Sequence, residues 1–265
     1  MKNLLLGTAL NYGVEQVRSF ILSFRKHNSK DDIALLISPE REAELSEFFA
    51  THSVKGIIFN PLRTINPCNT RLIKYRSVID DSWMYDAFLI SDVRDVVFQA
   101  DPFKDLPRDF VYCFEEDSGA TIGSEEFNSF WVRNIYGEDR LEEVRNSPIV
   151  CAGTIMGSRL KLLDLLTVII EDLEGISVDV MKFGMDQGIL NNICRSPFAS
   201  IIPITLKKNG DIVATLGITL DKKQGKDTLT IDSDSGMITI NTLVPAVIHQ
   251  YDRSEVLKKF YAELA

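Results

Sequence analysis

Two carboxylates and a guanidinium lie together at the end of an apolar run near the middle of the chain. Asp92, Arg94 and Asp95 follow the run Ala87–Ile90 after a single serine. Carboxylate oxygens are the ligands that Mg²⁺ and Mn²⁺ prefer, and such ions often bridge protein carboxylates to substrate phosphates. The same residues could form a turn whose acids cap backbone amides and pair with Arg94. The segment is therefore a candidate metal and phosphate site, with a structural turn as the alternative.

The first half of the chain alternates between strand-like and helix-like apolar patterns. Short apolar runs predict buried strands at Leu4–Leu10, Ile33–Ile37, Val54–Phe59 and Ala87–Ile90. Helical spacing between these runs predicts helices at Gly13–His27, about Glu40–Ala50 and around Asn69–Ile79. The alternation is typical of an α/β fold, a mostly parallel sheet flanked by helices. Because ligands of such sheets bind outside the carboxyl ends of the strands, Asp92 and Asp95 stand where a site is expected.

The second half is less regular. Its apolar runs predict strands at Phe110–Phe114 and Ile149–Met156, and its helical spacing predicts helices at Leu160–Leu173, Asp186–Cys194 and about Ser254–Leu264. A polar loop is expected over Asp117–Asn128, and short strands over Ile201–His249, with hairpin signals at Asn209-Gly210 and Ser235-Gly236. No linker or internal repeat interrupts the pattern. The sequence therefore predicts one continuous domain over 1–265, with a β-rich C-terminal elaboration.

The composition excludes some classes of function. The 265 residues carry 29 basic and 38 acidic side chains, a net charge of −9, which argues against a nucleic-acid partner because phosphate binding depends on clustered cations. No apolar stretch approaches the length of a membrane span, and the run LLLGTAL is short for a signal peptide. The four cysteines, Cys68, Cys113, Cys151 and Cys194, include no CxxC pair, so a disulfide framework is not expected. We expect a cytoplasmic protein without a transmembrane segment.

The segment FLISDVRDVVFQADPF, residues 88–103, resembles the metal-binding region of nucleotide-sugar glycosyltransferases with the GT-A fold. In that superfamily a D-x-D motif after a central strand carries the divalent ion and the donor diphosphate. Here the second acid is Asp95 and Arg94 takes the usual position, which gives a D-x-R-D variant in which Asp92 and Asp95 are both candidates for the metal contact. The resemblance implies a Rossmann-like GT-A domain, with a nucleotide-binding half at about 1–104 and an acceptor-side half at about 105–265.

Two later segments resemble parts of glycogenin-like retaining transferases. SPIVCAGTIMGS, residues 147–158, is similar to their N-A-G turn, with Cys151 in place of the asparagine. The resemblance implies that Ala152 and Gly153 contact the donor through backbone amides and leave space for the sugar. MDQGILNN, residues 185–192, is similar to their D-Q-x-x-L-N helix start, so Asp186 would bind sugar hydroxyls and Gln187 would lie near the anomeric carbon. The alternatives are a tight turn at Gly153 and a helix N-cap at Asp186.

The ends of the chain supply the remaining candidates. In AVIHQYDR, residues 246–253, the resemblance implies that His249 completes the metal shell and that Arg253 neutralises the diphosphate. A packed histidine and a solvated arginine are the alternatives. At the first strand's exit, the resemblance implies that the nucleotide base is bound by three residues, Thr8, Ala9 and Tyr12. It also implies that the helix carrying Arg71 and Lys74 sends a basic residue to the donor, where a solvated face is the alternative.

These resemblances together imply a metal-dependent glycosyltransferase that uses Mn²⁺ or Mg²⁺ and a nucleotide-sugar donor, expected to be a UDP-sugar. Arg94, Arg253 and Lys74 would share in stabilising the departing diphosphate. Similarity to glycogenin implies retention of configuration. An inverting enzyme would instead need a carboxylate base, for which Asp186, Glu115 and Glu116 are candidates.

The acceptor would be a glycan, lipid or protein hydroxyl, bound near the loops Asp117–Asn128 and Lys207–Lys226. Two other functions remain open. One is a sugar-phosphate nucleotidyltransferase, although the turn GTALNYG lacks the Gly-rich basic loop that such an enzyme would need. The other is a transferase-like binding protein without catalysis.

Overall fold

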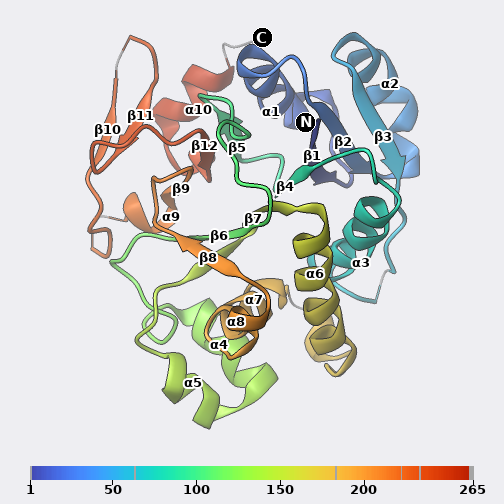
Figure 1. Ribbon diagram of the computed structural model, residues 1–265. Helices are drawn as coiled ribbons and strands as arrows, with labels where there is room; N and C mark the ends of the chain where they lie inside the picture. The colour runs from blue at the N-terminus through green and yellow to red at the C-terminus, as the bar shows by residue number, and fades with distance from the viewer. Residues whose placement is uncertain (1, 63, 183, 222, 233, 263–265) are drawn as a thin grey trace.

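A seven-stranded sheet forms the centre of the molecule (Figure 1). The computed structural model describes residues 2–62, 64–182, 184–221, 223–232 and 234–262. The strands of the central sheet follow the order β3-β2-β1-β4-β7-β6-β8. Their bounds are β1 Asn3–Ala9, β2 Asp32–Ile37, β3 Val54–Ile58, β4 Ala87–Ser91, β6 Val111–Glu115, β7 Val150–Ser158 and β8 Ile204–Lys207.

The sheet is mostly parallel. β1 pairs in parallel with β2 and β4, β2 with β3, and β6 with β8, while β7 runs antiparallel to both of its neighbours. β4 and β7 are buried along their whole length, as expected of central strands covered on both faces. After β3 the chain returns to the other side of β1 to form β4, so the strand order reverses between β1 and β4. In open α/β sheets, ligands bind at such a switch point.

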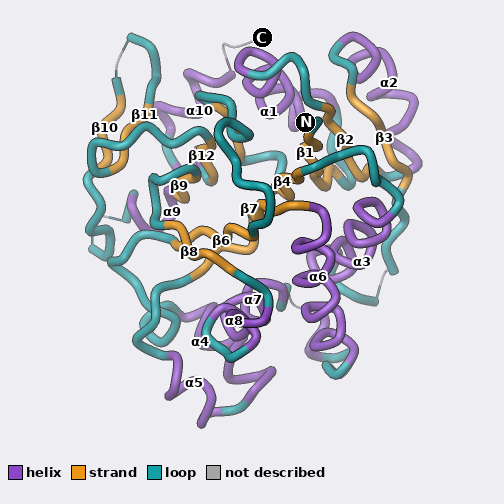
Figure 2. Tube along the Cα trace, viewed as in Figure 1, coloured by secondary structure: helices purple, strands orange, loops and turns teal. Residues whose placement is uncertain are grey.

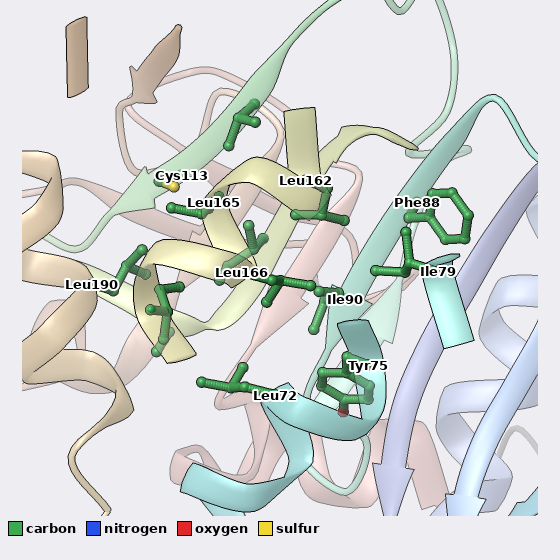
Figure 3. Close-up of a cluster of buried hydrophobic side chains, with 14 of the residues drawn as sticks. Leu72, Tyr75, Ile79, Phe88, Ile90, Cys113, Leu162, Leu165, Leu166 and Leu190 are labelled. Carbon is green, nitrogen blue, oxygen red and sulfur yellow. The ribbon is translucent and has the colours of Figure 1, made fainter. Parts of the chain in front are cut away.

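Helices cover both faces of the sheet. α1 and α2 pack on one face with Phe20, Phe24 and Phe49 in the core, and α3, α6 and α7 pack on the other. Figure 3 shows the second core, in which Leu72 and Tyr75 of α3 and Leu165 and Leu166 of α6 meet the sheet. The helix bounds are α1 Val14–His27, α2 Glu42–Thr51, α3 Pro67–Asp80, α4 Glu126–Tyr136, α5 Glu138–Val144, α6 Arg159–Glu174, α7 Asp186–Cys194, α8 Phe198–Ile201, α9 Leu216–Thr219 and α10 Glu255–Ala262, with short 3₁₀ turns η1 Pro39–Arg41, η2 Val180–Lys182 and η3 Tyr251–Arg253.

Two small sheets complete the fold (Figure 2). One holds β5 Val96–Phe98, β12 Val247–His249 and β9 Val213–Thr215, with β12 in the middle. The other is the antiparallel pair β10 Leu229–Ile231 and β11 Ile238–Ile240. β12 runs antiparallel to β5 and parallel to β9, so it joins segments that are far apart in the sequence. The α/β class and the additional β elements that the sequence predicts are thus present.

Several details differ from the expectation. The region after the predicted polar loop forms α4 and α5, which the sequence analysis did not identify, and α4 already begins within that loop, at Glu126. The turn at Asn209-Gly210 does not join a hairpin, because β8 pairs with β6 while β9 pairs with β12. The turn at Ser235-Gly236 does join the hairpin β10–β11, with Gly236 at a φ of 67°. The predicted last residues of the C-terminal helix, 263–264, and residue 222 of the predicted acceptor loop lie outside the described residues. Among the helices of the described ranges, none has the length and apolar character needed to cross a bilayer.

Candidate metal centre

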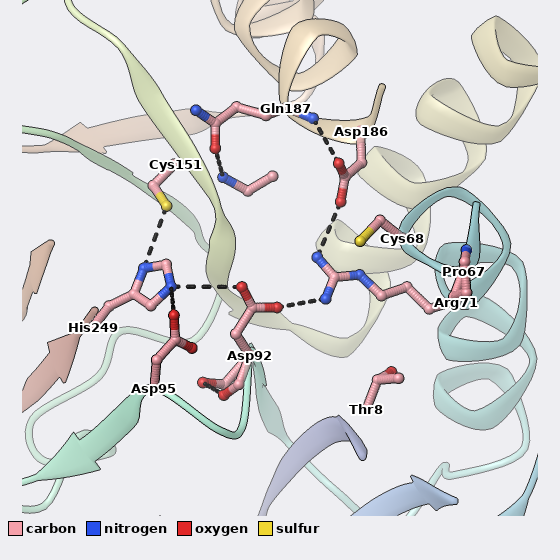
Figure 4. Close-up of polar contacts among 12 residues, drawn as sticks. Thr8, Pro67, Cys68, Arg71, Asp92, Asp95, Cys151, Asp186, Gln187 and His249 are labelled. Carbon is pink, nitrogen blue, oxygen red and sulfur yellow. Dashed lines mark hydrogen bonds and ion pairs between the residues drawn. The ribbon is translucent and has the colours of Figure 1, made fainter. Parts of the chain in front are cut away.

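Asp92 and Asp95 lie at the switch point of the sheet, in the turn that joins β4 to β5 (Figure 4). β4 is buried along its whole length, with four apolar residues before Ser91, so its direction and its end are fixed by the core. The backbone N–H of Asp92 donates to the carbonyl of Gly153 on β7, at 2.7 Å. This bond holds the start of the turn against the neighbouring strand.

His249 reaches the same place from the C-terminal part of the chain. It is the last residue of β12 and stands opposite Val96 in the antiparallel pairing with β5. Its Nε2 lies 3.5 Å from an Asp92 carboxylate oxygen and 3.7 Å from one of Asp95. The ligand atoms of the three residues all lie within 4.8 Å of one another. The imidazole is 2% exposed, so it is held in a single environment.

This donor set fits a divalent cation. Two carboxylates and one imidazole suit Mn²⁺, and three protein ligands leave coordination positions for a substrate. Gly153 supplies the room, since a Cβ at that position would lie 2.4 Å from His249 Cε1 and 2.7 Å from an Asp92 oxygen. The pairing of β6 with β7 shifts between Cys113 and Phe114, and the extra β7 residues of this bulge include Gly153. Such bulges bend a strand locally and are common beside active sites.

Arg71 joins the metal candidates to α7. Its guanidinium forms ion pairs with Asp92 and with Asp186, the latter at 3.0 Å, and only 10% of its side chain is exposed. α3 is placed for this contact by its first turn, where Asn66 caps the helix and Pro67 begins it. Asn69 accepts a hydrogen bond from the backbone N–H of Met185 at 2.8 Å, which ties the start of α3 to the start of α7. Arg71 is thus the basic residue of α3 that reaches the site.

The charges of the cluster are strongly coupled. Burial disfavours the Asp92 carboxylate, but Arg71 and His249 outweigh this effect and lower the pKa of Asp92. Burial together with the nearby Asp92 charge raises the pKa of Asp95. Burial alone would lower the pKa of His249, but contacts with Cys151 and the two aspartates raise it. The imidazole is therefore favoured as a cation between two carboxylates, which is the charge that a divalent ion would replace.

A cavity of about 330 Å³ opens beside the cluster. A second cavity of about 360 Å³ shares Leu10, Asn11 and Pro67 with it and extends along the carboxyl ends of β1 to β3. Both are in the size range of small-molecule sites. A larger cavity of about 710 Å³ lies at the amino ends of β1 and β4, between Asn3 and Arg108, away from the metal candidates. We favour the smaller pair because ligands of α/β sheets bind at the carboxyl ends.

The structure brings most of the predicted donor residues to this edge. Thr8, Tyr12 and Arg94 line the first cavity. The Thr8 hydroxyl also shares a hydrogen bond with the buried Tyr75 hydroxyl, at 2.5 Å. Ala9 is completely buried in the core and lines neither cavity.

The other predicted basic residues lie farther out. Lys74 is half-buried on α3, does not line the cavities, and makes no described hydrogen bond or ion pair with the site. Arg253 is 61% exposed and lies 3.9 Å from Asp252, which also pairs with Arg94 at 3.6 Å. Of the predicted basic residues, Arg71 is therefore the buried one that forms ion pairs within the site, while Arg94 lines the cavity.

Gln187 is held by three hydrogen bonds at the start of α7. Its side-chain oxygen accepts from the backbone N–H of Ala152 at 3.1 Å, and its nitrogen donates to Glu116 at 3.3 Å and Asn128 at 3.1 Å. Glu115, the neighbour of Glu116, instead pairs with Arg195 at 2.8 Å. Of the two glutamates considered as bases, Glu116 is thus the one that faces the site.

Sequence reasoning missed several contributors. Cys151 lies against His249, and Asn128 orients Gln187. Asn66 and Cys68 line the cavity beside the metal candidates. Cys151 was identified only as a replacement within the turn, and Asn128 only as the end of a polar loop. The Asn-Pro pair at 66–67 is a helix-start signal that could have placed Asn66. No known protein-family model matches this chain, and a search of curated proteins finds no match.

Proposed function

We propose that this protein is a metal-dependent glycosyltransferase of the GT-A type. It would transfer a sugar from a nucleotide-sugar donor, in our interpretation a UDP-sugar, to an acceptor hydroxyl. The observation that carries the proposal is the convergence of Asp92, Asp95 and His249 beside a cavity at the switch point of the sheet. The resemblance of residues 88–103 to the metal-binding region of these enzymes gives Asp92 and Asp95 a role, and that of residues 246–253 gives His249 one.

Asp92, Asp95 and His249 would hold Mn²⁺, or Mg²⁺, at the mouth of the cavity. When bound, the ion would neutralise charge on the diphosphate leaving group. Arg94 lines the cavity and is 55% exposed, so its guanidinium is free to move toward a diphosphate. Arg71 pairs with Asp92 and Asp186 and fixes their direction, and it favours the ionised form of Asp92. Arg71 thus orients the site, while Arg94 contacts the donor.

The adjoining cavities would bind the nucleotide part of the donor. Tyr12 and Thr8 line the one next to the metal candidates, where an aromatic ring can stack on the base. The second cavity, lined by Ser38 and Asn60, adds polar groups within reach of the same ligand. The small-residue turn at Ala152 and Gly153 and the buried Asp186 would bind the sugar. Together these residues form one continuous donor site along the sheet edge.

The stereochemical course depends on whether a carboxylate takes the proton of the acceptor hydroxyl. In the retaining reaction that the glycogenin-like segments imply, the acceptor hydroxyl attacks on the face from which the diphosphate leaves, and no separate base is needed. Glu116 is the alternative base for an inverting reaction. Burial raises the pKa of Glu116, which favours proton acceptance near neutral pH. The anomeric configuration of the product distinguishes the two.

The test is a donor panel with Mn²⁺, read as release of free nucleotide. We expect release from at least one UDP-sugar by the wild type, and none by Asp95→Asn. The matched control is Asp139→Asn, an exposed aspartate on α5, which should behave as the wild type. No release from any donor, together with no binding of UDP in the presence of Mn²⁺, would contradict the proposal. Tight UDP binding without turnover would indicate a binding protein, and pyrophosphate release from UTP and a sugar phosphate would indicate a nucleotidyltransferase.

A further inference from the structure

The far side of the His249 ring is occupied by a thiol. Cys151 on β7 is 1% exposed, and its Sγ lies 3.4 Å from His249 Nδ1 (Figure 4). The other ring nitrogen, Nε2, faces Asp92 and Asp95. One imidazole edge therefore points to the metal candidates and the opposite edge to sulfur. The thiol is on the wrong side of the ring to be a metal ligand itself.

Cys151 also contacts the group behind it. Its side chain is hydrogen-bonded to the carboxylate of Glu116, which in turn accepts from the Gln187 amide at 3.3 Å. A thiol has one weak donor and a weak acceptor, so both can be used at once. With the S–H directed to Glu116, the sulfur lone pairs would be directed to the ring. These contacts connect His249 through Cys151 and Glu116 to Gln187 at the start of α7.

We propose that Cys151 is a positioning residue of the metal centre, because its sulfur accepts the Nδ1–H of His249 and so leaves the Nε2 lone pair for the cation. This inference rests on the proposed metal site. Histidines that bind metals nearly always donate their second N–H to a carboxylate, a carbonyl or water, and loss of such a partner typically weakens metal binding about 10–100-fold. In this chain the thiol has that role, and Glu116 fixes the direction of the thiol.

The turn that carries Cys151 explains why a side chain can reach the ring there. The bulge in β7 begins directly after Cys151, which still pairs with Phe114 of β6. Cys151 therefore keeps a fixed place in the sheet, while Gly153, which has no side chain, leaves room for the ligands. A merely packed cysteine would tolerate an apolar side chain of similar size, and this difference can be tested.

The test compares Cys151→Ser, which keeps an acceptor and a donor, with Cys151→Val, which fills the space but has neither. Mn²⁺ alone is titrated into each protein by calorimetry, and folding is checked by thermal unfolding in a chelator. We expect Cys151→Ser to bind as the wild type and Cys151→Val to bind about 10–100-fold more weakly. The matched control is Cys113→Val, a completely buried cysteine on β6 that is hydrogen-bonded to Cys194 and should not change the affinity.

Nitrogen-15 spectra of the wild type give a second readout that needs no variant. With only three histidines in the chain, the ring of His249 can be assigned, and we expect an exchange-protected proton on its Nδ1. Equal Mn²⁺ affinity of Cys151→Val and the wild type, or an unprotected Nδ1, would overturn the positioning role and leave the proposed function standing. Absence of Mn²⁺ binding by the wild type would instead overturn the metal site, and the inference with it.

Discussion

The central sheet and the small β5–β12–β9 sheet both supply parts of the candidate site, yet they are built in opposite ways. The central sheet has seven strands, is covered by helices on both faces, and forms much of its first half from neighbouring segments of the chain. The small sheet has three strands of three residues each, drawn from residues 96–98, 213–215 and 247–249. Much of the first is formed by segments that are close in the sequence, whereas every pairing in the second joins segments that are far apart.

This difference separates the helix-covered core from the junction of the two sheets, where the metal candidates lie, with Arg71 linking the two parts. Asp92 is fixed by the end of β4, but it meets His249 only because β12 pairs with β5. A change in the helix-covered core should therefore unfold the protein without altering the site. A substitution where the two sheets meet should weaken metal binding more than it lowers stability. Four substitutions test this separation, and their expected effects on stability decrease from Arg71→Ala to Arg94→Ala.

Arg71→Ala should cause the largest loss of stability. It leaves the Asp92 and Asp186 carboxylates without their guanidinium partner, and breaking a buried ion pair in this way costs about 3–5 kcal/mol. Urea unfolding measures the loss. Arg76→Ala on the same helix is the control, because its exposed side chain bonds only to Thr167 in the described structure and should cost about 1 kcal/mol or less. Equal losses would show that Arg71 is not integral to the fold.

Leu165→Ala should be nearly as costly but should leave the site intact. Leu165 is completely buried on α6 within the core of Figure 3, and large-to-small changes of this kind cost about 2–5 kcal/mol. Mn²⁺ affinity, measured well below the unfolding temperature, should equal that of the wild type. A weaker affinity in the folded protein would mean that the core and the site are not separable.

Gly153→Ala should show the reverse pattern. The new methyl group would collide with His249 and Asp92, and overpacking of this kind costs about 1–3 kcal/mol. Because the colliding atoms are the proposed metal ligands, Mn²⁺ binding should be lost even in the folded protein. Gly175→Ala, at the end of α6, meets only a carbonyl oxygen at 3.4 Å and serves as the control. Retained Mn²⁺ affinity in Gly153→Ala would remove the site from the junction of the sheets.

Arg94→Ala should have the smallest effect on stability. Its pair with Asp252 is exposed, with 55% of the arginine side chain accessible, and such pairs contribute about 0–1 kcal/mol. If Arg94 contacts the diphosphate, UDP affinity in the presence of Mn²⁺ should fall while Mn²⁺ affinity stays the same. Calorimetry with each ligand separates the two. An unchanged UDP affinity would remove Arg94 from the donor site.

The contrast between the sheets also explains what the sequence could predict. β1 to β4 are rich in apolar residues and are separated by helical periods, so their succession along the chain and the place of Asp92 and Asp95 could be predicted from local pattern. The pairing of β12 with β5 has no local signal, so His249 came from a family resemblance. The bulge at Gly153 and the contact of Cys151 with His249 arise from strand register, which single-residue patterns do not encode. α4 was missed although Phe127, Phe130 and Trp131 have helical spacing, because the polar residues before them favoured a loop.

The most direct test of the central claim is Mn²⁺ binding to the metal-free protein, measured by electron paramagnetic resonance in the presence of UDP. We expect one bound ion per chain in the wild type and in Asp139→Asn, and loss of that ion in Asp95→Asn. The claim would be contradicted if Asp95→Asn bound the ion as tightly as the wild type, or if the wild type bound none.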